Sequence, residues 1–241
     1  RGDQVLEVVV PRFWITLKYN IIALLVYLPL GFILGIISAY KKNGIFDKFV
    51  NTITLVFGSI PTYILTFLLI VLLGYRLTIF PPYYGAIKPG FWGSIVGLGI
   101  PIIALSAAGV SKISRVVRDE MSDALDSKFV LLLQTKGLTK LKIFFKHLLR
   151  HSFVGVLPVM IDVFMFILMG SFFVEMVFGI DGVANLLYDG LIRTFSDVTY
   201  IRIDVNTTIV ICTFYMVLVA VFSLIVDITY FLIDPRIRIN N

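Results

Sequence analysis

Cysteine and histidine are scarce in this chain of 241 residues, which has one cysteine and two histidines. The single Cys212 lies inside an apolar run, so the chain has no disulfide framework, and cysteine usage does not indicate a redox compartment. His147 and His151 lie one helical turn apart, but no H-E-x-x-H pattern or cysteine pair accompanies them. Lys146 and Arg150 would repel a cation at this place, so we interpret the histidines as basic or interfacial residues and expect no metal site.

Signatures of an enzyme are also missing from the sequence. No G-x-x-x-x-G-K-[ST] phosphate loop occurs, so the chain does not by itself bind ATP in the P-loop manner. No Ser/His/Asp arrangement and no pair of carboxylates lies on a plausible soluble face. We therefore expect no catalytic residues in this chain and no cofactor bound by it.

Hydrophobic residues, by contrast, make up 59% of the chain, and the mean hydropathy is +0.96. Soluble domains contain about 45–50% apolar residues, so the composition predicts a membrane protein. The net charge is +6. Because the lysines and arginines alternate with apolar stretches and do not form one soluble basic face, we expect no nucleic-acid partner.

Five apolar segments reach the length of about 20 helical residues that a bilayer core requires. They cover approximately residues 13–40, 50–73, 91–110, 154–178 and 209–233. The predicted fold class is all-α, a polytopic membrane bundle of about five transmembrane helices that forms a single domain over residues 1–241. In the first segment, the spacing of Gly31 and Gly35 would allow another helix to approach closely.

The distribution of positive charge predicts an orientation. Of the 21 lysines and arginines, 14 fall in the loops after the first and third spans and in the C-terminal tail. Cytoplasmic loops carry this kind of excess, so we expect the loop at 111–153 and the C-terminus to be cytoplasmic. Five spans then place the N-terminus outside. Since the chain begins at Arg1 and not at Met, we expect that a natural N-terminal span is missing.

A basic amphipathic segment at residues 126–152 separates the third span from the fourth. Gly137 interrupts it, which predicts two short helices that meet at a turn. Lysine and arginine alternate here with apolar residues at helical spacing, which are Leu138, Leu141, Phe144, Phe145, Leu148 and Leu149. Such a segment either docks on a partner protein or lies on anionic lipid, and the residues alone favour neither.

Three acidic residues, Asp162, Glu175 and Asp227, fall within or near the ends of the last two spans. A carboxylate at the centre of a membrane helix costs about 2.5–3.5 kcal/mol to insert, so each requires a partner or a water-filled cavity. We interpret Glu175 and Asp227 first as interfacial. Asp162 is the better candidate for a translocation pathway, and Glu175 is kept as a second possible pathway residue.

Four motifs point to a known family. They are Thr135-Lys136-Gly137-Leu138-Thr139 with Lys146-His147-Leu148-Leu149-Arg150; Ser59-Ile60-Pro61; Val174-Glu175-Met176-Val177-Phe178 with Gly182; and Asp227-Ile228-Thr229-Tyr230 with Ile233-Asp234-Pro235-Arg236-Ile237. Together they resemble the membrane-spanning permease subunits of bacterial ABC importers, most closely the dipeptide/oligopeptide group. The chain departs from that pattern in the bulky Leu131-Leu132-Leu133 before Gly137, and at Gly155, where a proline is usual.

The resemblance implies a function for the basic segment, which would be a cytoplasmic coupling helix that docks in a groove of a separate ATPase subunit. Its coupling residues would be Thr135, Lys136, Gly137, Leu138, Thr139, Leu141 and Phe144. Leu138, Leu141 and Phe144 would enter the groove. Lys140 and Lys142 would meet its acidic or polar rim.

The resemblance also implies partners and a location. We expect a second homologous permease, two ATPase subunits that bind ATP and Mg²⁺, an extracellular substrate-binding protein and membrane lipid, in the inner membrane of a bacterium. The chain would form half of a translocation pathway for peptides. Alternatives are the same scaffold importing nickel chelates or another small solute, or a membrane docking or regulatory protein. An ion channel is disfavoured because no filter segment is visible.

Overall fold

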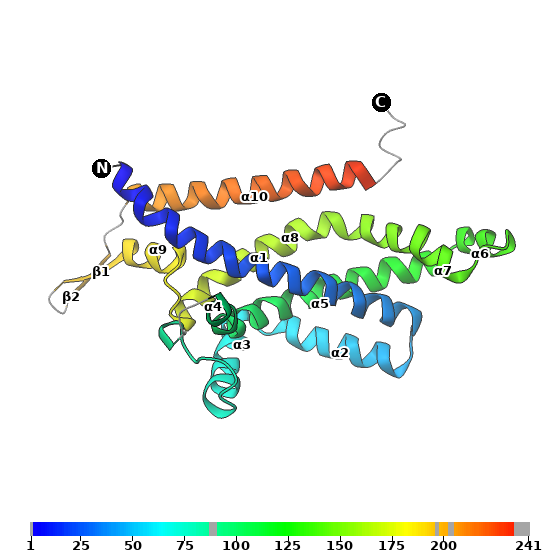
Figure 1. The fold of residues 1–241 in the computed structure, drawn as a ribbon, viewed down its shortest axis with the longest axis horizontal. Helices are drawn as coiled ribbons and strands as arrows, with labels where there is room; N and C mark the ends of the chain where they lie inside the picture. The colour runs from blue at the N-terminus through cyan, green and yellow to red at the C-terminus, as the bar shows by residue number, and fades with distance from the viewer. Residues whose placement is uncertain (1, 87–90, 196–197, 202–204, 234–241) are drawn as a thin grey trace. The chain divides into compact units, whose positions relative to one another are not determined.

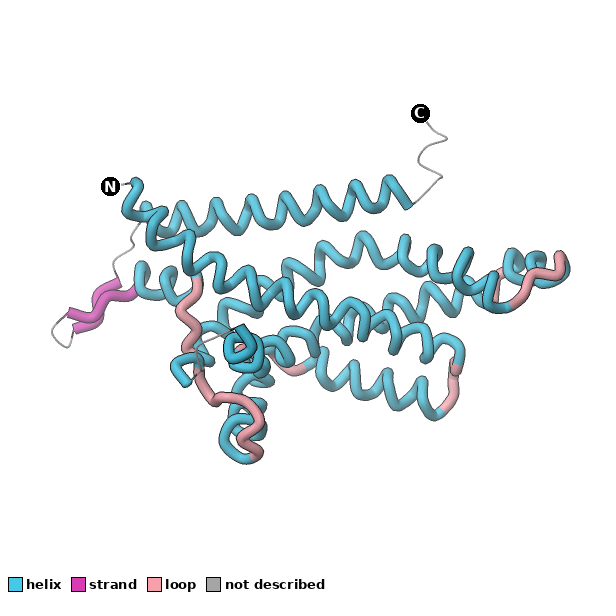
Figure 2. Tube along the Cα trace, viewed as in Figure 1, coloured by secondary structure: helices cyan, strands magenta, loops and turns pink. Residues whose placement is uncertain are grey.

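The computed structural model describes residues 2–86, 91–195, 198–201 and 205–233, and nearly all of them are helical (Figures 1 and 2). In chain order the elements are α1 (Gly2–Tyr40), α2 (Ile45–Ser59), α3 (Thr62–Leu69), the π-helix η1 (Ile70–Arg76), the 3-10 helix η2 (Tyr84–Ala86), α4 (Phe91–Gly97), α5 (Gly99–Leu125), α6 (Lys128–Thr135), α7 (Lys140–Ile143), the π-helix η3 (Phe144–Leu148), α8 (Leu149–Phe178), α9 (Val183–Leu191), β1 (Ile192–Phe195), β2 (Val198–Ile201) and α10 (Val205–Ile233). Outside the described residues lie the charges at Arg1, Lys88, Arg202, Arg236 and Arg238 and the motif residues from Asp234 to Ile237.

The predicted class, a helical membrane bundle with about five spans, is confirmed. Among the described residues, four helices are long and apolar enough to cross a membrane, and a pair of helices bent by 101° makes a fifth if the pair is counted as one span. The four are Val5–Tyr40, Gly99–Leu125, Lys140–Phe178 and Val205–Ile233, and the pair is Ile45–Ser59 with Thr62–Arg76. A small antiparallel hairpin that the sequence did not predict joins β1 to β2, with Ile192 opposite Ile201 and Phe195 opposite Val198.

The second expected span, residues 50–73, is divided in two at Ile60 and Pro61. Pro61 has φ −54° and ψ 135°, and it precedes the first residue of α3. Proline lacks the N–H that a helix interior needs, and it disfavours helical geometry in the residue before it. The break in the span is therefore caused by Pro61 alone. The hydropathy of the segment does not reveal this effect.

The third expected span begins in α4 and continues into α5, which extends to Leu125, well beyond residue 110. The second half of α5 is amphipathic, because its buried residues Ile113, Val117, Met121 and Ala124 recur every three or four positions. Lys112, Arg115 and Asp119 on other faces of this half are exposed. The buried face of α5 therefore extends as far as the basic segment, where Met121 and Ala124 pack against it.

The chain divides into two compact units. The first consists of Arg1–Leu24, Ile60–Ser106 and Phe166–Ala220, and the second of Leu25–Ser59, Ala107–Met165 and Val221–Asn241. The first unit contains a cluster of Val9, Val183 and Ile211, in which the start of α1 meets α9 and α10. The second unit contains the basic segment, with a core of its own.

Within the second unit, α1 and α5 pack closely through Gly31 and Gly35. A Cβ atom on Gly31 would lie 2.7 Å from Cγ2 of Ile113, and one on Gly35 would lie 2.6 Å from the carbonyl oxygen of Ser114. Real Cβ atoms do not approach other atoms so closely, so only glycine fits at either position. The predicted close approach of a helix to this face of α1 is confirmed.

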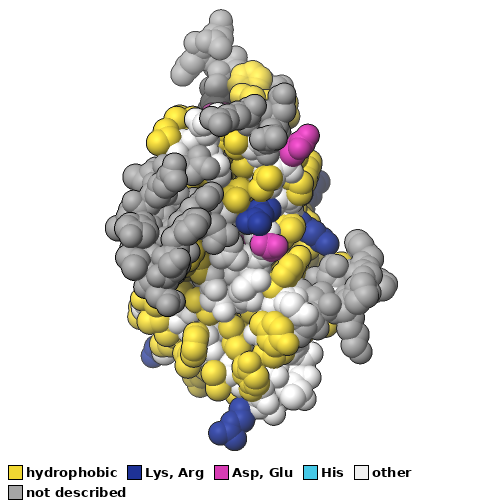
Figure 3. Space-filling model, turned by 90° about the vertical axis from the view of Figure 1, so that its left-hand side faces the viewer, with side chains coloured by type: hydrophobic (Ala, Val, Ile, Leu, Met, Phe, Trp, Pro, Cys, Tyr) yellow, Lys and Arg dark blue, Asp and Glu magenta, His cyan; other side chains and the backbone are white. Residues whose placement is uncertain are grey.

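Much of the remaining surface is apolar. In α10, Met216 and Leu232 are exposed, and in α2 and α3 so are Phe49 and Phe67. On the one face that Figure 3 draws, patches of hydrophobic side chains lie among other side chains and backbone, with a few charged side chains between them. Helices with apolar outer faces are those that a bilayer can solvate.

Candidate functional site

The basic segment folds as a short helix joined by a turn to the beginning of a longer one. α6 ends at Thr135, α7 begins at Lys140, and the π-helix η3 continues without interruption into α8. Gly137 lies in the turn with φ +79°, in the left-handed region that other residues rarely adopt. The predicted break at Gly137 is confirmed, but only α6 is a short helix, because α7 and η3 are the beginning of a continuous helix of 39 residues, Lys140–Phe178.

The turn after α6 has the hydrogen bonds of a Schellman motif. The N–H of Gly137 donates to the carbonyl oxygen of Gln134 at 2.9 Å, and the N–H of Leu138 donates to that of Leu133 at 3.2 Å. This pairing satisfies the last carbonyl groups of a helix, and it typically brings the residue after the glycine against the last turn. Leu138 packs against the cluster that contains Leu133, as the motif requires.

Side-chain caps fix the beginnings of both helices. Ser127 Oγ accepts a hydrogen bond from the N–H of Val130, and Thr139 Oγ1 accepts one from the N–H of Lys142, each at 3.4 Å. Serine and threonine are preferred at this position because the first N–H groups of a helix lack backbone partners. Thr135 to Thr139 thus form a turn in which a glycine ends one helix and a threonine starts the next.

The segment is anchored by an apolar cluster, which we call the base. Its buried members come from α1, α5, α6, α7 and η3, and they are Ala39, Met121, Ala124, Val130, Leu133, Ile143 and Leu148. Leu138 and Phe144 are partly buried against it. Phe144 also lies beside Tyr40, with ring centroids 6.0 Å apart. The base therefore fixes the helix pair to the ends of α1 and α5.

The structure separates the three apolar residues expected to enter a partner's groove. Leu138 and Phe144 pack on the base, whereas Leu141 is 72% exposed. Other exposed apolar residues of the segment are Phe129, Leu131, Leu132 and Phe145. Lys136, Lys140 and Lys142 are exposed as well. A helix pair that exposes both apolar side chains and lysines is suited to a groove with an acidic or polar rim.

Arg150 closes the segment with a contact to the last helix. Its Nε donates to the carbonyl oxygen of Ile233 at 3.0 Å, and its Nη2 also donates to this oxygen. The final carbonyls of a helix have no partner within it, so a cation at this place completes the C-terminal end of α10. The two histidines have different neighbours: His147 meets Phe129 of the same segment edge-on, and His151 Nε2 lies 3.8 Å from Glu120 Oε2 on α5.

Glu175 lies in the first unit, fully buried within α8. Its Oε1 accepts hydrogen bonds from the hydroxyls of Thr16 and of Tyr19, the latter at 2.6 Å. Its Oε2 accepts from the N–H of Ala184 at 2.7 Å. Thr16 Oγ1 in turn accepts from the N–H of Val183 at 3.1 Å, so both side chains serve the first N–H groups of α9.

Gly182 is required beside this carboxylate, because a Cβ atom there would collide with Glu175. The sequence motif that joins Glu175 to Gly182 thus describes the place where α8 turns into α9. Thr16 and Tyr19, the partners on α1, are more than 150 residues away in the chain, and no local pattern marks them.

The other two acidic residues are in different surroundings. Asp162 is exposed on α8, and Asp227 is exposed on α10. Neither of them belongs to a buried network like that of Glu175, whose oxygens are enclosed by α1, α8 and α9. Of the acidic residues in the last two spans, Asp162 is accessible from outside the protein and Glu175 is not.

Comparison with known proteins finds transport permeases that match nearly the whole chain. Residues 31–239 match the model of the family described as "Binding-protein-dependent transport system inner membrane component". The dipeptide transport system permease DppB of Lactococcus lactis is 31% identical over 239 residues, 99% of this chain and 73% of that protein. The oligopeptide permease OppB of Salmonella typhimurium is 30% identical over 96% of this chain and 71% of its own length.

A solved structure shares the fold. The inward-facing MetNI methionine ABC transporter matches with a TM-score of 0.72 and 17% sequence identity, and the match covers 95% of this chain and 97% of that one. At that identity the match establishes the architecture alone.

The membrane-spanning helices and the family match together define a multi-pass bacterial membrane transport subunit. The chain belongs to the family of binding-protein-dependent transport system inner membrane components. It is the membrane-spanning permease subunit of an importer, and its function is transport.

Proposed function

We propose that the chain forms half of the translocation pathway of an ATP-driven peptide importer. Permeases similar to it are named for dipeptides and oligopeptides. It would act as one permease domain beside a second homologous permease, with an extracellular binding protein that delivers the peptide. ATP and Mg²⁺ would bind in two separate ATPase subunits.

The observation that carries the proposal is the division of the basic segment into an anchored face and a free face. The base holds Leu138 and Phe144, whereas Leu141 and Phe145 are 72% and 65% exposed. A partner can therefore push on the free face and move the helix pair as one body. The turn from Thr135 to Thr139, with Lys136 and Gly137, would give that body its shape, and Leu141 would contact the ATPase directly.

The distribution of positive charge supports a cytoplasmic position for this segment and for the C-terminus, where ATPase subunits reside. For the two acidic residues we propose different roles. Asp162, exposed on α8, is a pathway residue. Glu175, enclosed by its donors, supports the structure next to the pathway and does not line it.

Substitution at Leu141 tests the docking proposal. Leu141→Glu would bring a charge into the groove and remove the burial of a leucine side chain, which contributes about 1.5–3 kcal/mol. We expect the affinity for the ATPase subunits to fall at least about tenfold, because about 1.4 kcal/mol corresponds to a factor of ten. ATP-driven peptide uptake by proteoliposomes should be lost, and the amount of permease in the membrane should not change.

Leu141→Met is the matched control, since it keeps an apolar side chain of similar volume. Normal uptake and normal recovery of ATPase subunits with Leu141→Glu would refute the docking role. The cargo is tested in the same vesicles with labelled dipeptide, labelled oligopeptide and a nickel chelate. Accumulation of the chelate alone would show that the scaffold serves another solute.

A further inference from the structure

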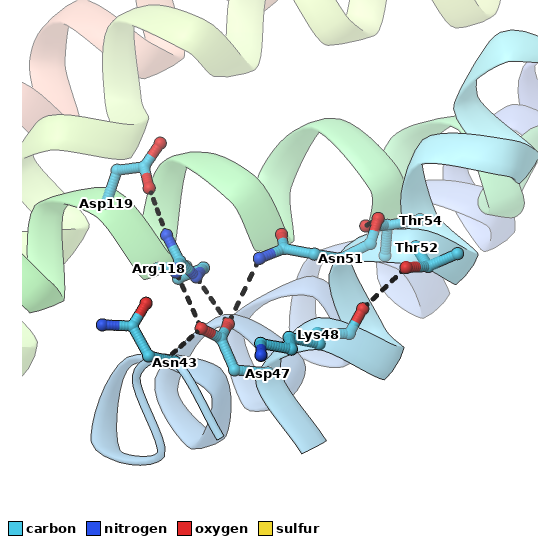
Figure 4. Close-up of polar contacts among 8 residues, drawn as sticks. All are labelled: Asn43, Asp47, Lys48, Asn51, Thr52, Thr54, Arg118 and Asp119. Atoms are coloured by element: carbon cyan, nitrogen blue, oxygen red, sulfur yellow. Dashed lines mark hydrogen bonds and ion pairs between the residues drawn. The ribbon is translucent and has the colours of Figure 1, made fainter. Parts of the chain in front are cut away.

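An ion pair in the second unit fastens the start of α2 to α5 (Figure 4). Arg118 Nε donates to Asp47 Oδ1 at 2.6 Å, and Arg118 Nη2 donates to Asp47 Oδ2 at 2.7 Å. The two parallel hydrogen bonds join a planar guanidinium to a carboxylate in the bidentate geometry that only arginine provides. The Asp47 side chain is 2% exposed and that of Arg118 is 19% exposed. Solvent therefore screens this contact little.

Further donors hold Asp47 in place. The N–H of Asn43 donates to Oδ2 at 2.9 Å, and the side-chain amide of Asn51 donates to Oδ1 at 3.2 Å. Arg118 in turn donates through Nη1 to Asp119 at 3.0 Å, as Figure 4 shows. Both carboxylate oxygens of Asp47 thus accept two hydrogen bonds each. The turn between α1 and α2 is locked to a single position on α5.

A second ion pair reinforces the same turn. Lys42 Nζ lies 2.7 Å from Asp126 Oδ2, at the junction of α5 and α6. This pair is more exposed than the first and contributes less, because water screens it. It nevertheless places the turn after α1 directly beside the start of the basic segment.

The position of these contacts matters because α2 is otherwise separate from the base. The basic segment continues directly into α8, and it is joined to α5 by the short turn at Asp126 and Ser127. The end of α1 contributes Ala39 to the base. None of the described members of the base comes from α2.

α2 follows α5 from the ion pair onward. Ser111 Oγ donates to the carbonyl oxygen of Thr54, and a Cβ atom on Gly58 would collide with Ser111. These contacts of small residues hold α2 close, but they do not fix it along the helix axis as a bidentate pair does. The ion pair is therefore the contact that resists sliding of α2 along α5.

We propose that Asp47 and Arg118 are positioning residues that make α2 move together with the basic segment when ATPase subunits displace it. The inference rests on the proposed function. α2 is the first half of a broken membrane span, so its displacement carries movement of the segment into the transmembrane part of the chain. Without the pair, α5 and α8 would still follow the segment, whereas α2 would follow it less closely, held only by the turn from α1, by the exposed Lys42–Asp126 pair and by its contacts with Ser111.

The experiment uses the full chain assembled with its second permease, ATPase subunits and binding protein in proteoliposomes. Arg118→Lys keeps the charge and removes the fork, and Asp47→Asn keeps the shape and removes the charge. The matched control is Arg115→Lys, since Arg115 is exposed one turn earlier on α5. We measure recovery of ATPase subunits with the permease and the number of ATP molecules hydrolysed per peptide imported.

We expect Arg118→Lys and Asp47→Asn each to recover normal amounts of ATPase and to raise the ATP consumed per peptide at least threefold. The double variant should be no worse than the more severe single variant, because both act through one contact. Arg115→Lys should match the wild type. An unchanged ratio in Arg118→Lys, or additive losses in the double variant, would overturn the inference.

If the proposed function is wrong, the wild-type permease will recover no ATPase subunits at all. That result overturns both proposals, and it differs from every result that overturns only the role of the ion pair. A parallel fall of ATPase activity and uptake in the variants, with less folded protein, would show a merely structural role and overturn this inference alone.

A second measurement does not depend on turnover. Spin labels at Phe49→Cys on α2 and Lys128→Cys on α6, both exposed positions, are introduced after Cys212→Ser removes the native thiol. In the wild type the distance between the labels should be the same with and without ATP. In Arg118→Lys it should change with nucleotide. A distance that changes equally in both proteins would contradict the inference.

Discussion

Replacing Glu175 by alanine should destabilise the protein strongly, because three buried donors lose their acceptor. The hydroxyls of Thr16 and Tyr19 and the N–H of Ala184 all point at its carboxylate, and all four residues are at most 1% exposed. An unsatisfied buried donor costs about 1–3 kcal/mol. The hydroxyls can partly reorient and the backbone N–H cannot, so we expect a loss of about 3–5 kcal/mol in the free energy of unfolding.

Glutamine at position 175 should behave differently from alanine. Its carbonyl oxygen can still accept from the N–H of Ala184, while its amide can donate to a hydroxyl that rotates. The expected loss is about 1 kcal/mol. For a chain of this length 1 kcal/mol corresponds to roughly 2–4 °C in the melting temperature, so alanine should lower it by roughly 6–20 °C and glutamine by roughly 2–4 °C.

Thermal unfolding of the purified protein in detergent, followed by circular dichroism, measures both shifts. Asp162→Asn on the same helix is the control, because an exposed side chain should change stability by no more than about 0.5 kcal/mol. If Glu175→Ala melted at the same temperature as Asp162→Asn, the hydrogen-bond network would not have the stabilising role assigned to it. A melting temperature of Glu175→Gln as low as that of Glu175→Ala would show that charge matters more than hydrogen bonding.

Two further substitutions test the packing of the second unit. Gly137→Ala should lower the free energy of unfolding by about 1–2 kcal/mol and increase hydrogen exchange of α6, because a φ of +79° disfavours a residue with a Cβ atom even though nothing lies within 4 Å of that atom. Gly137→Asn should have a smaller effect, and equal hydrogen exchange in the two variants would contradict this reasoning. Gly35→Val should lower the free energy of unfolding by about 1–3 kcal/mol, because the new Cβ atom would press on the backbone of Ser114. Ile33→Val, on the exposed side of α1, is the control, and equal melting temperatures of the two variants would refute the close contact.

Local sequence was sufficient for most of the helical architecture. Runs of apolar residues determine the long helices α1, α8 and α10, because a helix in a bilayer satisfies its own backbone hydrogen bonds. The break at Pro61 and the hairpin of β1 and β2 were not foreseen. Hydropathy averages over a window, so it registers neither a single proline nor two short strands outside the membrane segments.

The candidate site was partly legible in the same way. Gly137 marks a turn by its own conformational preference, and the turn is where the pattern predicts it. The helix start at Thr139, capped by its hydroxyl, was not predicted. Which of the apolar residues are buried and which are exposed could not be predicted from the sequence. Leu138, Leu141 and Phe144 have the same periodicity, but a periodic pattern cannot tell a side chain that packs on its own protein from one that is left exposed.

The sequence by itself determined a helical membrane protein with a basic segment interrupted at Gly137, since composition, span length and turn residues act through near neighbours in the chain; the likeness to permeases rests on its four motifs. Tertiary structure alone decided which partners the buried charges have. Asp47 meets Arg118 across 71 residues, and Glu175 meets Thr16 across 159. A charge removed from water requires a partner, but which residue supplies it depends on how helices pack, and local sequence does not encode that.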